Sequence, residues 1–408
     1  MVQSASEPVQ FTPDSPQAWV RLGLALLIGT IGSVGMWSVV VALPAVQADF
    51  GASRAGASLA FTAVMLGFGS GGVLTGRLCD RFGIVTAIAL GTVAIAVGYV
   101  AAGLSPGLWY FVAAHFIIGF GSSATFAPLM AEASHWFDRH RGIAVTVAAS
   151  GNYFGGALWP PLVNWGIEGV GWQTTHIVIG LVSAAAMAAV LLVLYRRMGG
   201  EARTNFENMA PPRVSLPISN NALTALLGLA SIACCVAMAM PQVHIVAYCG
   251  DLGYGAARGA EMLSLMLGFG IISRIGSGYL ADRIGGLRTL LVGSLLQGLA
   301  LVFYLMFNSL VSLYVISAMF GLFQGGIVPS YAIIVREVMP AREAATRVGT
   351  VIFASVIGMS LGGWLSGVIF DATGSYAAAF VNGIAWNLFN VAIVVMLLLR
   401  ARRKPAMA

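Results

Sequence analysis

The 408-residue chain is 58% hydrophobic and only 9% charged, and its mean hydropathy is +0.88. It therefore carries more apolar surface than a soluble core could bury, which excludes an ordinary soluble enzyme and predicts lipid as the solvent. The net charge of +6 does not indicate a nucleic-acid binder, because the basic residues stand singly or in pairs at the ends of apolar runs. The four cysteines have no metal-type spacing, so we expect free thiols and no cofactor.

Apolar runs long enough to cross a hydrocarbon core about 30 Å thick recur along the chain. Residues 1–18 are polar and lack the charged and apolar segments of a cleaved signal, so they are expected to be a tail. The sequence then predicts an all-α membrane protein with twelve transmembrane helices. Their expected ranges are 19–43, 57–78, 83–103, 108–131, 142–165, 173–195, 221–247, 259–280, 287–307, 309–335, 347–370 and 376–400.

One polar connection is long, and it divides the chain in two. Residues 196–220 contain four arginines and a Pro-Pro pair and follow the sixth apolar run. We therefore expect an N-terminal tail (1–18), a six-helix bundle (19–195), this linker, a second six-helix bundle (221–400) and a C-terminal tail (401–408).

The basic residues predict the orientation. Of the 21 Lys and Arg residues, Arg54 and Arg258 fall on one side of this topology and Arg274 falls inside a span, so the other 18 fall on the opposite side. Loops rich in Lys and Arg face the cytoplasm. Both termini and the linker are therefore expected there.

Two turns share the pattern G-x-L-x-D-R-x-G and lie 202 residues apart, close to half the chain length. Each follows the second span of its half, which indicates a duplication. Glycine lets helices approach closely, and Asp and Arg beside helix termini can pair with each other and with helix dipoles, so we expect gating loops. An ordinary charged loop that only fixes orientation is the alternative. The residues of the pattern are Gly76, Asp80, Arg81 and Gly83, then Gly278, Asp282, Arg283 and Gly285.

This repeated loop resembles the signature loop of the major facilitator superfamily, and the resemblance covers essentially the whole chain. It implies two pseudo-symmetric six-helix bundles, a substrate site between them near the membrane midplane, and alternating access by rocking of the halves. No G-x-x-x-x-G-K-[ST] motif occurs, so ATP is not the expected energy source. No catalytic constellation stands out either, and we do not expect an enzyme.

Arg274 is the one charged residue expected near the middle of the membrane. It lies eight residues before Asp282, hence roughly 12 Å from the cytoplasmic end of its helix. A charge at that depth costs about 2.5–3.5 kcal/mol on insertion scales and needs a reason. The planar guanidinium matches a carboxylate, so an organic anion is the simplest ligand. A permanent pair with a protein group is the alternative.

Further candidates for substrate binding are expected at similar depth. Asn152, Phe126 and Gln324 each lie about 15–18 Å from the cytoplasmic surface in the predicted spans. Bonding between helices is the alternative role for Asn152 and Gln324, and packing alone is the alternative for Phe126. Trp37 and Tyr153 are further candidates for a cavity wall.

His244 and Asp251 lie seven residues apart toward the outer end of span seven. If the helix persists, they share a face about 10 Å apart. A histidine near a carboxylate can take up and release protons near neutral pH, so this pair is a candidate for proton coupling. The alternative is a histidine at the headgroup level and a solvated loop aspartate.

The pattern H-x-x-x-Y-x-x-D-x-G at His244, followed by Arg274 in span eight, resembles bacterial members of the monocarboxylate porter branch, related to oxalate/formate exchangers. This resemblance implies that Arg274 binds the substrate carboxylate and that His244 with Asp251 carries the proton. It also implies a multi-pass protein of the bacterial inner membrane, which we expect to work as a monomer.

The chain departs from these relatives at three places. Its only lysine is Lys404 in the tail, and Ser355 stands where the oxalate exchangers have a lysine in span eleven, so a dianion is not expected. Gly270 stands where mammalian-type relatives have an aspartate, which puts their mode of proton coupling in doubt. Gly321 and its neighbours in span ten leave room for a bulkier or aromatic acid.

We therefore expect a secondary active transporter for a small organic monoanion, a monocarboxylate, coupled to protons or working by exchange. The alternative is a proton-driven exporter of hydrophobic drugs or metabolites on the same fold. Such exporters often carry an acidic residue in the N-terminal cavity, and none of Asp49, Asp80, Glu132 and Asp138 is expected at mid-membrane.

Overall fold

The computed structural model describes residues 13–137, 139–197, 214–215 and 217–403. Most of the predicted linker and the outer parts of both predicted tails lie outside these residues. The described residues form helices and one two-residue ladder. In chain order they are α1 (Pro16–Gly32), α2 (Val34–Phe50), α3 (Arg54–Gly103), α4 (Leu108–Ser123), α5 (Ala127–Trp136), α6 (Arg141–Arg197), β1 (Val214–Ser215), α7 (Asn220–Asp251), α8 (Ala256–Ile284), α9 (Gly286–Met306), α10 (Leu310–Gln324), α11 (Ile327–Val338), α12 (Ala341–Thr373), α13 (Tyr376–Arg400) and β2 (Arg402–Arg403).

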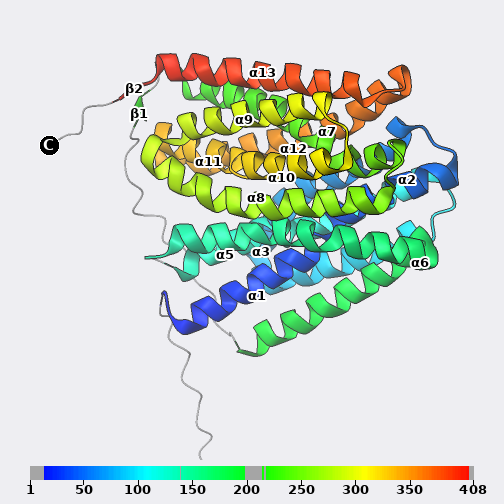
Figure 1. Ribbon diagram of the computed structural model, residues 1–408. Helices are drawn as coiled ribbons and strands as arrows, with labels where there is room; N and C mark the ends of the chain where they lie inside the picture. Colours follow the sequence, from blue (N-terminus) through cyan, green and yellow to red (C-terminus); the bar gives the residue numbers. More distant parts are fainter. Residues whose placement is uncertain (1–12, 138, 198–213, 216, 404–408) are drawn as a thin grey trace, which may run out of the picture.

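The described helices make twelve crossings, as predicted. Eleven helical stretches are long and apolar enough to cross a membrane, and one of them, Ile143–Val193, has 51 residues. At about 1.5 Å per residue that stretch is more than twice the thickness of a 30 Å core. Gly171 divides it into two crossings, with φ 81° and ψ 161°. In Figure 1 the chain enters α1 and leaves α13 at the same end of the bundle, which we call the terminal end; the opposite end is the far end.

Several helices begin or end beyond the predicted spans. The first crossing starts at Pro16, where the Ser15 side chain accepts a hydrogen bond from the backbone of Ala18, and α7 continues to Asp251. The apolar runs are shorter than the helices because the first and last turns of a helix contain polar residues. Caps stabilise these turns, but a search for apolar segments leaves them out.

The crossings form two bundles that lie side by side. In Figure 1 most of α7 to α13, coloured green to red, lies above most of the N-terminal half, coloured blue to green, while α2 reaches up to the level of α7 and α8. The two halves meet mainly through α6 against α8, α3 against α12 and α2 against α7. The site therefore has to be sought along these three pairs.

The two halves repeat each other in backbone detail. Gly83 (φ 81°, ψ 162°) and Gly285 (φ 85°, ψ 160°) turn the chain after the second crossing of each half, in a conformation that other residues adopt only with strain. Gly119 on α4 and Gly321 on α10 also lie 202 residues apart. A Cβ at these positions would lie 2.0 Å and 1.9 Å from the carbonyl oxygens of Val64 and Met266, respectively, so equivalent helices cross at equivalent glycines.

In the second of the repeated loops, Asp282 and Arg283 do not pair with each other in this state. Asp282 is exposed and makes no hydrogen bond or ion pair with the described residues. Arg283 turns back along α8, donates to the Tyr279 hydroxyl and lies 4.3 Å from the centre of its ring. Arg81 lies 5.1 Å from the ring centre of Phe82. The expected Asp–Arg pair is thus absent in the second loop, because an aromatic ring beside each arginine takes its place; the Asp80 side chain lies outside the described residues.

Three crossings are broken near mid-depth, which apolar periodicity did not predict. The first breaks at Ser33, the fourth between α4 and α5, and the tenth at Gly325 and Gly326. The first two breaks pack together, because a Cβ at Gly32 would lie 2.4 Å from the Thr125 hydroxyl. Broken helices at membrane depth are tolerated where they are buried in protein or line a cavity, and they expose backbone polar groups there.

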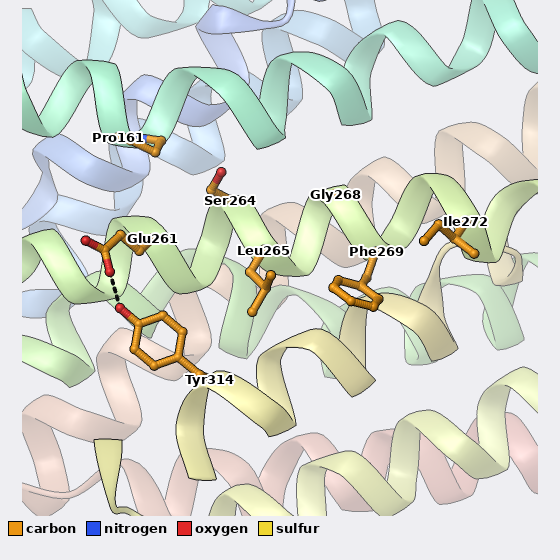
Figure 2. Close-up of a pocket in the computed structure, with 8 residues that line it drawn as sticks. All are labelled: Pro161, Glu261, Ser264, Leu265, Gly268, Phe269, Ile272 and Tyr314. Atoms are coloured by element: carbon orange, nitrogen blue, oxygen red, sulfur yellow. Dashed lines mark hydrogen bonds between the residues drawn. The ribbon is translucent and has the colours of Figure 1, made fainter. Parts of the chain in front are cut away.

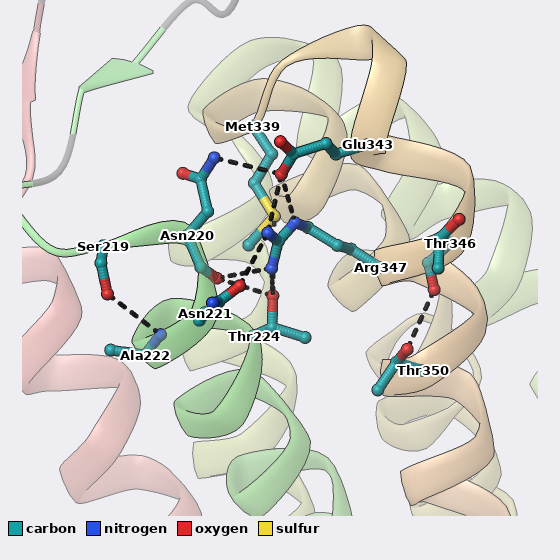
Figure 3. Close-up of polar contacts among 10 residues, drawn as sticks. All are labelled: Ser219, Asn220, Asn221, Ala222, Thr224, Met339, Glu343, Thr346, Arg347 and Thr350. Carbon is teal, nitrogen blue, oxygen red and sulfur yellow. Dashed lines mark hydrogen bonds and ion pairs between the residues drawn. The ribbon is translucent and has the colours of Figure 1, made fainter.

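Arg347 ties α12 to the start of α7 at the terminal end (Figure 3). Its Nη1 donates to the Asn220 carbonyl at 2.9 Å and to the Thr224 hydroxyl at 2.7 Å, and its Nη2 donates to Asn221 at 2.9 Å. Its Nε donates to Glu343, one turn earlier, at 2.8 Å. One guanidinium therefore satisfies exposed backbone and side-chain acceptors of two helices.

Replacing Arg347 by methionine should lower the thermal stability of the purified protein. The change leaves the Thr224 hydroxyl and the Asn220 carbonyl without this donor, and hydrogen bonds to charged groups contribute about 1.5–3 kcal/mol each. We expect a loss of roughly 2 kcal/mol and a lower Tm, measured by intrinsic fluorescence. Arg288→Met, at an exposed arginine of α9, is the matched control. Equal Tm values for the two variants would contradict this role.

Candidate functional site

Arg274 reaches across the boundary between the two halves. It lies on α8, and its Nη1 donates to the carbonyl oxygen of Ala149 on α6 at 2.8 Å. Its guanidinium carbon lies 4.6 Å from the centre of the Tyr153 ring, also on α6. The residue is 8% exposed, and its Nε is buried without a partner. A carbonyl dipole and a π face hold this cation, but neither neutralises it.

The lack of a counter-ion distinguishes Arg274 from the other two buried arginines of the described chain. Arg21 pairs with Glu132 at 2.6 Å, and Arg54 pairs with Asp251 at 3.1 Å. Arg274 makes no ion pair with any described residue. The alternative of a permanent internal pair is therefore not realised in this state. A buried charge without a partner costs several kcal/mol, and an anionic ligand would remove that cost.

Gly270 gives the Tyr153 ring its place beside Arg274. A Cβ at residue 270 would lie 2.3 Å from Cε1 and 2.5 Å from Cδ1 of Tyr153. The ring can therefore lie against α8 only because residue 270 has no side chain. The position where mammalian-type relatives were expected to have an aspartate is filled here by the edge of a tyrosine from the other half.

Gly270→Ala should weaken the binding of an anion at Arg274. The methyl group would push the Tyr153 ring away, and overpacking of this kind costs typically 1–3 kcal/mol. We expect roughly a tenfold higher Kd for an anionic ligand, measured by isothermal titration, with a folded protein by size-exclusion chromatography. Gly268→Ala is the matched control, because a Cβ there lies 3.8 Å from that of Ala157. A ligand affinity unchanged by Gly270→Ala would refute the packing argument.

Trp37 fixes the orientation of Asn152 within the N-terminal half. The Trp37 Nε1 donates to both the backbone and the side-chain oxygen of Asn152, each at 3.1 Å. The Asn152 oxygen is thereby occupied, while its Nδ2 makes no bond with the described residues. Asn152 directly precedes Tyr153, so this free donor lies one residue from the ring that contacts Arg274.

Gln324 and Phe126 stand at the breaks of the tenth and fourth crossings. Gln324 is fully buried; its Oε1 accepts from Gln242 Nε2 at 2.7 Å, and its own Nε2 has no partner. Gln242 on α7 was not among the predicted site residues, because a lone glutamine in an apolar run gives no distinguishing signal. Phe126 is half-buried, and its ring centre lies 5.7 Å from that of Phe68.

Three of the predicted substrate-binding residues, Arg274, Gln324 and Asn152, each have an N–H donor without an acceptor; we call them the donor layer. Arg274 Nε and Gln324 Nε2 are buried and unpartnered, and Asn152 Nδ2 makes no described bond. The break beside Gln324 abuts α8, because a Cβ at Gly325 would lie 2.3 Å from the carbonyl oxygen of Gly270, one turn before Arg274. Guanidinium and amide N–H groups bind carboxylate oxygens, so the donor layer suits an anion.

A second polar cluster, the far-end gate, joins the halves and consists of Arg54, His244, Asp251, Asp371 and Tyr376. Arg54 on α3 donates to Tyr376 at 2.8 Å and to Asp251 at 3.1 Å, both in the C-terminal half. The Asp371 carboxylate accepts from the backbone N–H groups of Arg54 at 2.9 Å and Ala55 at 2.7 Å. A carboxylate of one half thus caps the start of a helix in the other, which the helix dipole favours.

His244 belongs to this gate through Tyr376. Its Nε2 lies 2.7 Å from the Gly363 carbonyl oxygen and its Nδ1 lies 3.1 Å from the Tyr376 hydroxyl. A carbonyl only accepts, so Nε2 carries the hydrogen and Nδ1 accepts from the tyrosine, whose oxygen in turn accepts from Arg54. His244 and Asp251 lie on one continuous helix, the condition for sharing a face, but Tyr376 and Arg54 connect them. His244 is fully buried, whereas the Asp251 side chain is 38% exposed.

The described hydrogen bonds between the halves all lie at Arg274 or on its far side. Besides the far-end gate, Thr62 donates to the Ser360 carbonyl at 3.0 Å, and Ser264 donates to the Ala157 carbonyl. Two cavities, of about 520 Å³ along α8 and about 540 Å³ between α7 and α12, lie elsewhere, and Arg274 lines neither. This state is therefore closed at the far end, and Arg274, 8% exposed, is largely covered in it.

Twelve crossings in two repeated halves, with a buried arginine that makes no ion pair at their boundary, are the architecture of a polytopic membrane transporter. The family description Major Facilitator Superfamily matches residues 25–315 and 275–408, and the chain belongs to that superfamily. The resemblance inferred from the repeated loop is thus confirmed.

Named relatives include transporters of different cargo. Monocarboxylate transporter 13 of Bos taurus is 26% identical over 331 residues, which are 78% of this chain and 75% of that protein. The Agnestins efflux protein AgnL12 of Paecilomyces divaricatus is 22% identical over 324 residues, 79% of this chain and 73% of that protein. A solved structure of a bacterial homologue of the human lysosomal transporter Spinster, inward-facing and occupied, covers 95% of this chain and 96% of its own, with TM-score 0.68 and 15% identity. This last likeness shows the fold alone.

Proposed function

We propose that the protein moves a small organic monoanion, a monocarboxylate, across the inner membrane of a bacterial cell by alternating access. The observation that carries the proposal is the buried, unpaired guanidinium of Arg274 at the boundary between the halves. The named relative Monocarboxylate transporter 13 supports the same class of substrate. Among the described residues no second buried cation lies beside Arg274, which favours a monoanion over a dianion.

In the proposed mechanism the substrate replaces a contact between the halves. The empty carrier holds Arg274 against the Ala149 carbonyl and the Tyr153 ring. A carboxylate would pair with two N–H groups on one side of the guanidinium in place of the Ala149 carbonyl, while the Tyr153 ring stays against the guanidinium; such a bidentate pair is stronger than a bond to a neutral carbonyl. The donors of Asn152 and Gln324 would orient its oxygens, and the rings of Phe126 and Trp37 would face its apolar part. Binding would thus remove the hydrogen bond between α8 and α6 and allow the halves to rock.

The distribution of charge supports an orientation with the terminal end in the cytoplasm. The far-end gate then closes the periplasmic side, and the state resembles an inward-facing or occluded one. The repeated loops lie at the cytoplasmic end. We propose that their Asp and Arg residues pair when that end closes and separate when it opens, with a single chain as the working unit.

Proton coupling is proposed to act through the far-end gate. A second proton on His244 would make both ring nitrogens donors, so Nδ1 could no longer accept from Tyr376. It would also place a second positive charge beside Arg54. Protonation therefore favours opening of the gate, and Asp251 and Asp371, which bind Arg54 and its helix, would rebalance the charge.

The test of the substrate class is a thermal-shift screen of purified protein against mono- and dicarboxylates of increasing size. A ligand that binds only the folded state raises the apparent stability, by about 2.7 kcal/mol at a hundredfold excess over Kd. We expect stabilisation by one or more monocarboxylates, followed by uptake of the same compound into proteoliposomes. If no carboxylate stabilises the protein while neutral or cationic compounds do, the proposal is wrong.

An exporter of hydrophobic compounds is the second candidate, because relatives of similar identity include an efflux protein. Drug-susceptibility assays in cells that express the protein separate the two functions. Resistance to several unrelated hydrophobic compounds, without carboxylate flux, would favour export. Glu132, the nearly buried acidic residue of the described N-terminal half, is 12% exposed and pairs with Arg21 at 2.6 Å, so it is not a free carboxylate of the kind that proton-driven export would use.

A further inference from the structure

A groove of about 520 Å³ runs along α8 on the far side of Arg274 (Figure 2). Its floor is the α8 segment from Glu261 to Ile272. Figure 2 shows Pro161 of α6 above this segment and Tyr314 of α10 below it. The groove therefore has a wall from each half of the protein. Its remaining lining residues are Ser264, Leu265, Gly268 and Phe269.

The groove has the length of one leaflet of a membrane. Glu261 lies five residues after the start of α8 at Ala256, hence about 7 Å from the far end of the helix at ~1.5 Å per residue. Ile272, which is 59% exposed, lies about 16 Å further along the helix. Half of a hydrocarbon core about 30 Å thick is about 15 Å. The groove thus extends from the headgroup boundary to the midplane.

The mouth of the groove is polar, whereas its length is mostly apolar. Arg258 Nη1 donates to the two carboxylate oxygens of Glu261 at 3.2 and 3.0 Å, and the Tyr314 hydroxyl also donates to Glu261. The Arg258 and Glu261 side chains are 52% and 43% exposed. Both of these bonds come from Nη1. Arg258 Nε and Nη2 make no hydrogen bond with the described residues. They can bind a phosphate, and the carboxylate keeps lone pairs for an amine.

We propose that this groove binds one phospholipid of the far-end leaflet that carries a primary-amine headgroup. Its acyl chain lies along Leu265, Gly268 and Phe269, its phosphate binds Arg258, and its ammonium group binds Glu261. The zwitterionic headgroup is complementary to the Glu–Arg pair. An anionic headgroup without an amine would instead place its negative charge beside the negative charge of Glu261, and the two would repel. Because Pro161 belongs to the other half, the bound chain contacts both halves and stabilises the state closed at the far end.

The groove can be filled without disturbing the backbone. A Cβ at Gly268 would lie 3.8 Å from the Ala157 Cβ, an ordinary contact, so the side chain of Gly268→Leu can enter the groove. Gly23 on α1 has nothing within 4 Å of such a Cβ, so Gly23→Leu makes the same chemical change outside the groove. Glu261→Gln removes the carboxylate charge and keeps the shape of the mouth.

The proposal is tested by native mass spectrometry of purified full-length protein equilibrated with equal amounts of phosphatidylethanolamine, phosphatidylcholine and phosphatidylglycerol. We expect one retained lipid, with phosphatidylethanolamine favoured several-fold. Gly268→Leu should lose this lipid and Gly23→Leu should keep it, while Glu261→Gln should keep a lipid without the preference. Equal retention of the three lipids by the unmodified protein, or equal retention by Gly268→Leu and Gly23→Leu, would mean ordinary boundary lipid and would overturn the proposal.

Discussion

Replacing Arg274 by glutamine is expected to abolish carboxylate uptake while leaving the protein folded. Glutamine keeps an N–H donor on the same face of α8, but it ends two bonds short of Nη1, so the hydrogen bond to the Ala149 carbonyl is weakened or lost while the packing of α6 against α8 remains. It brings no charge, and a charge-assisted bidentate pair is roughly twice as strong as a neutral hydrogen bond. The unpaired buried charge is also gone, so the variant should be as stable as the unmodified protein or more so. We expect uptake into proteoliposomes to fall at least a hundredfold, a difference of about 2.7 kcal/mol.

Arg288→Gln is the matched control, because it makes the same change at an exposed arginine of α9. Arg274→Lys is the informative intermediate: it keeps the charge but loses the planar fork, so uptake should be reduced without being lost. Carboxylate uptake that survives Arg274→Gln at the control level would remove the main support for an anion carrier, and the fold alone would remain.

Much of the architecture follows from sequence because lipid imposes simple rules. Every crossing must be about 20 apolar residues long, and the repeated glycine turn at Gly83 and Gly285 marks equivalent points of two halves. The breaks at Ser33 and beside Phe126 did not follow from these rules. Both lie inside apolar runs, and backbone groups beside them are satisfied by neighbours that only the packed bundle supplies, such as Trp159, whose Nε1 donates to the Thr30 carbonyl at 2.9 Å.

The candidate site was predictable in its depth but not in its pairing. Arg274 stands out in sequence because a charge in an apolar run is costly, whatever surrounds it. Its contact with Tyr153 depends on Gly270, a residue whose importance is the absence of a side chain. Pairs such as Arg54 with Asp371 join residues more than 300 positions apart, and a single sequence gives no means of matching them.

Arg54→Gln is expected to open the far-end gate. Arg54 is 9% exposed, and its guanidinium contacts Asp251, Tyr376 and the Phe370 ring, the last at 4.5 Å. All three partners belong to the other half, so these contacts exist only in the closed state. Breaking a buried ion pair costs about 3–5 kcal/mol, and the partial exposure of Asp251 reduces this to roughly 1–3 kcal/mol. A free-energy difference of 1.4 kcal/mol changes the ratio of open to closed molecules about tenfold. The open state should therefore become at least several-fold more populated.

The measurement uses a cysteine in place of Ser360, which is 5% exposed and whose carbonyl accepts from Thr62 of the other half. A membrane-impermeant maleimide added from the far side reaches this position only when the gate opens. Labelling should be several-fold faster with Arg54→Gln and unchanged with Arg288→Gln, at an exposed arginine of α9 at the opposite end. Acidification should also speed labelling in the unmodified gate, because a second proton on His244 removes its bond from Tyr376. Labelling rates that respond neither to Arg54→Gln nor to pH would mean that packing, and not these charges, closes the far end.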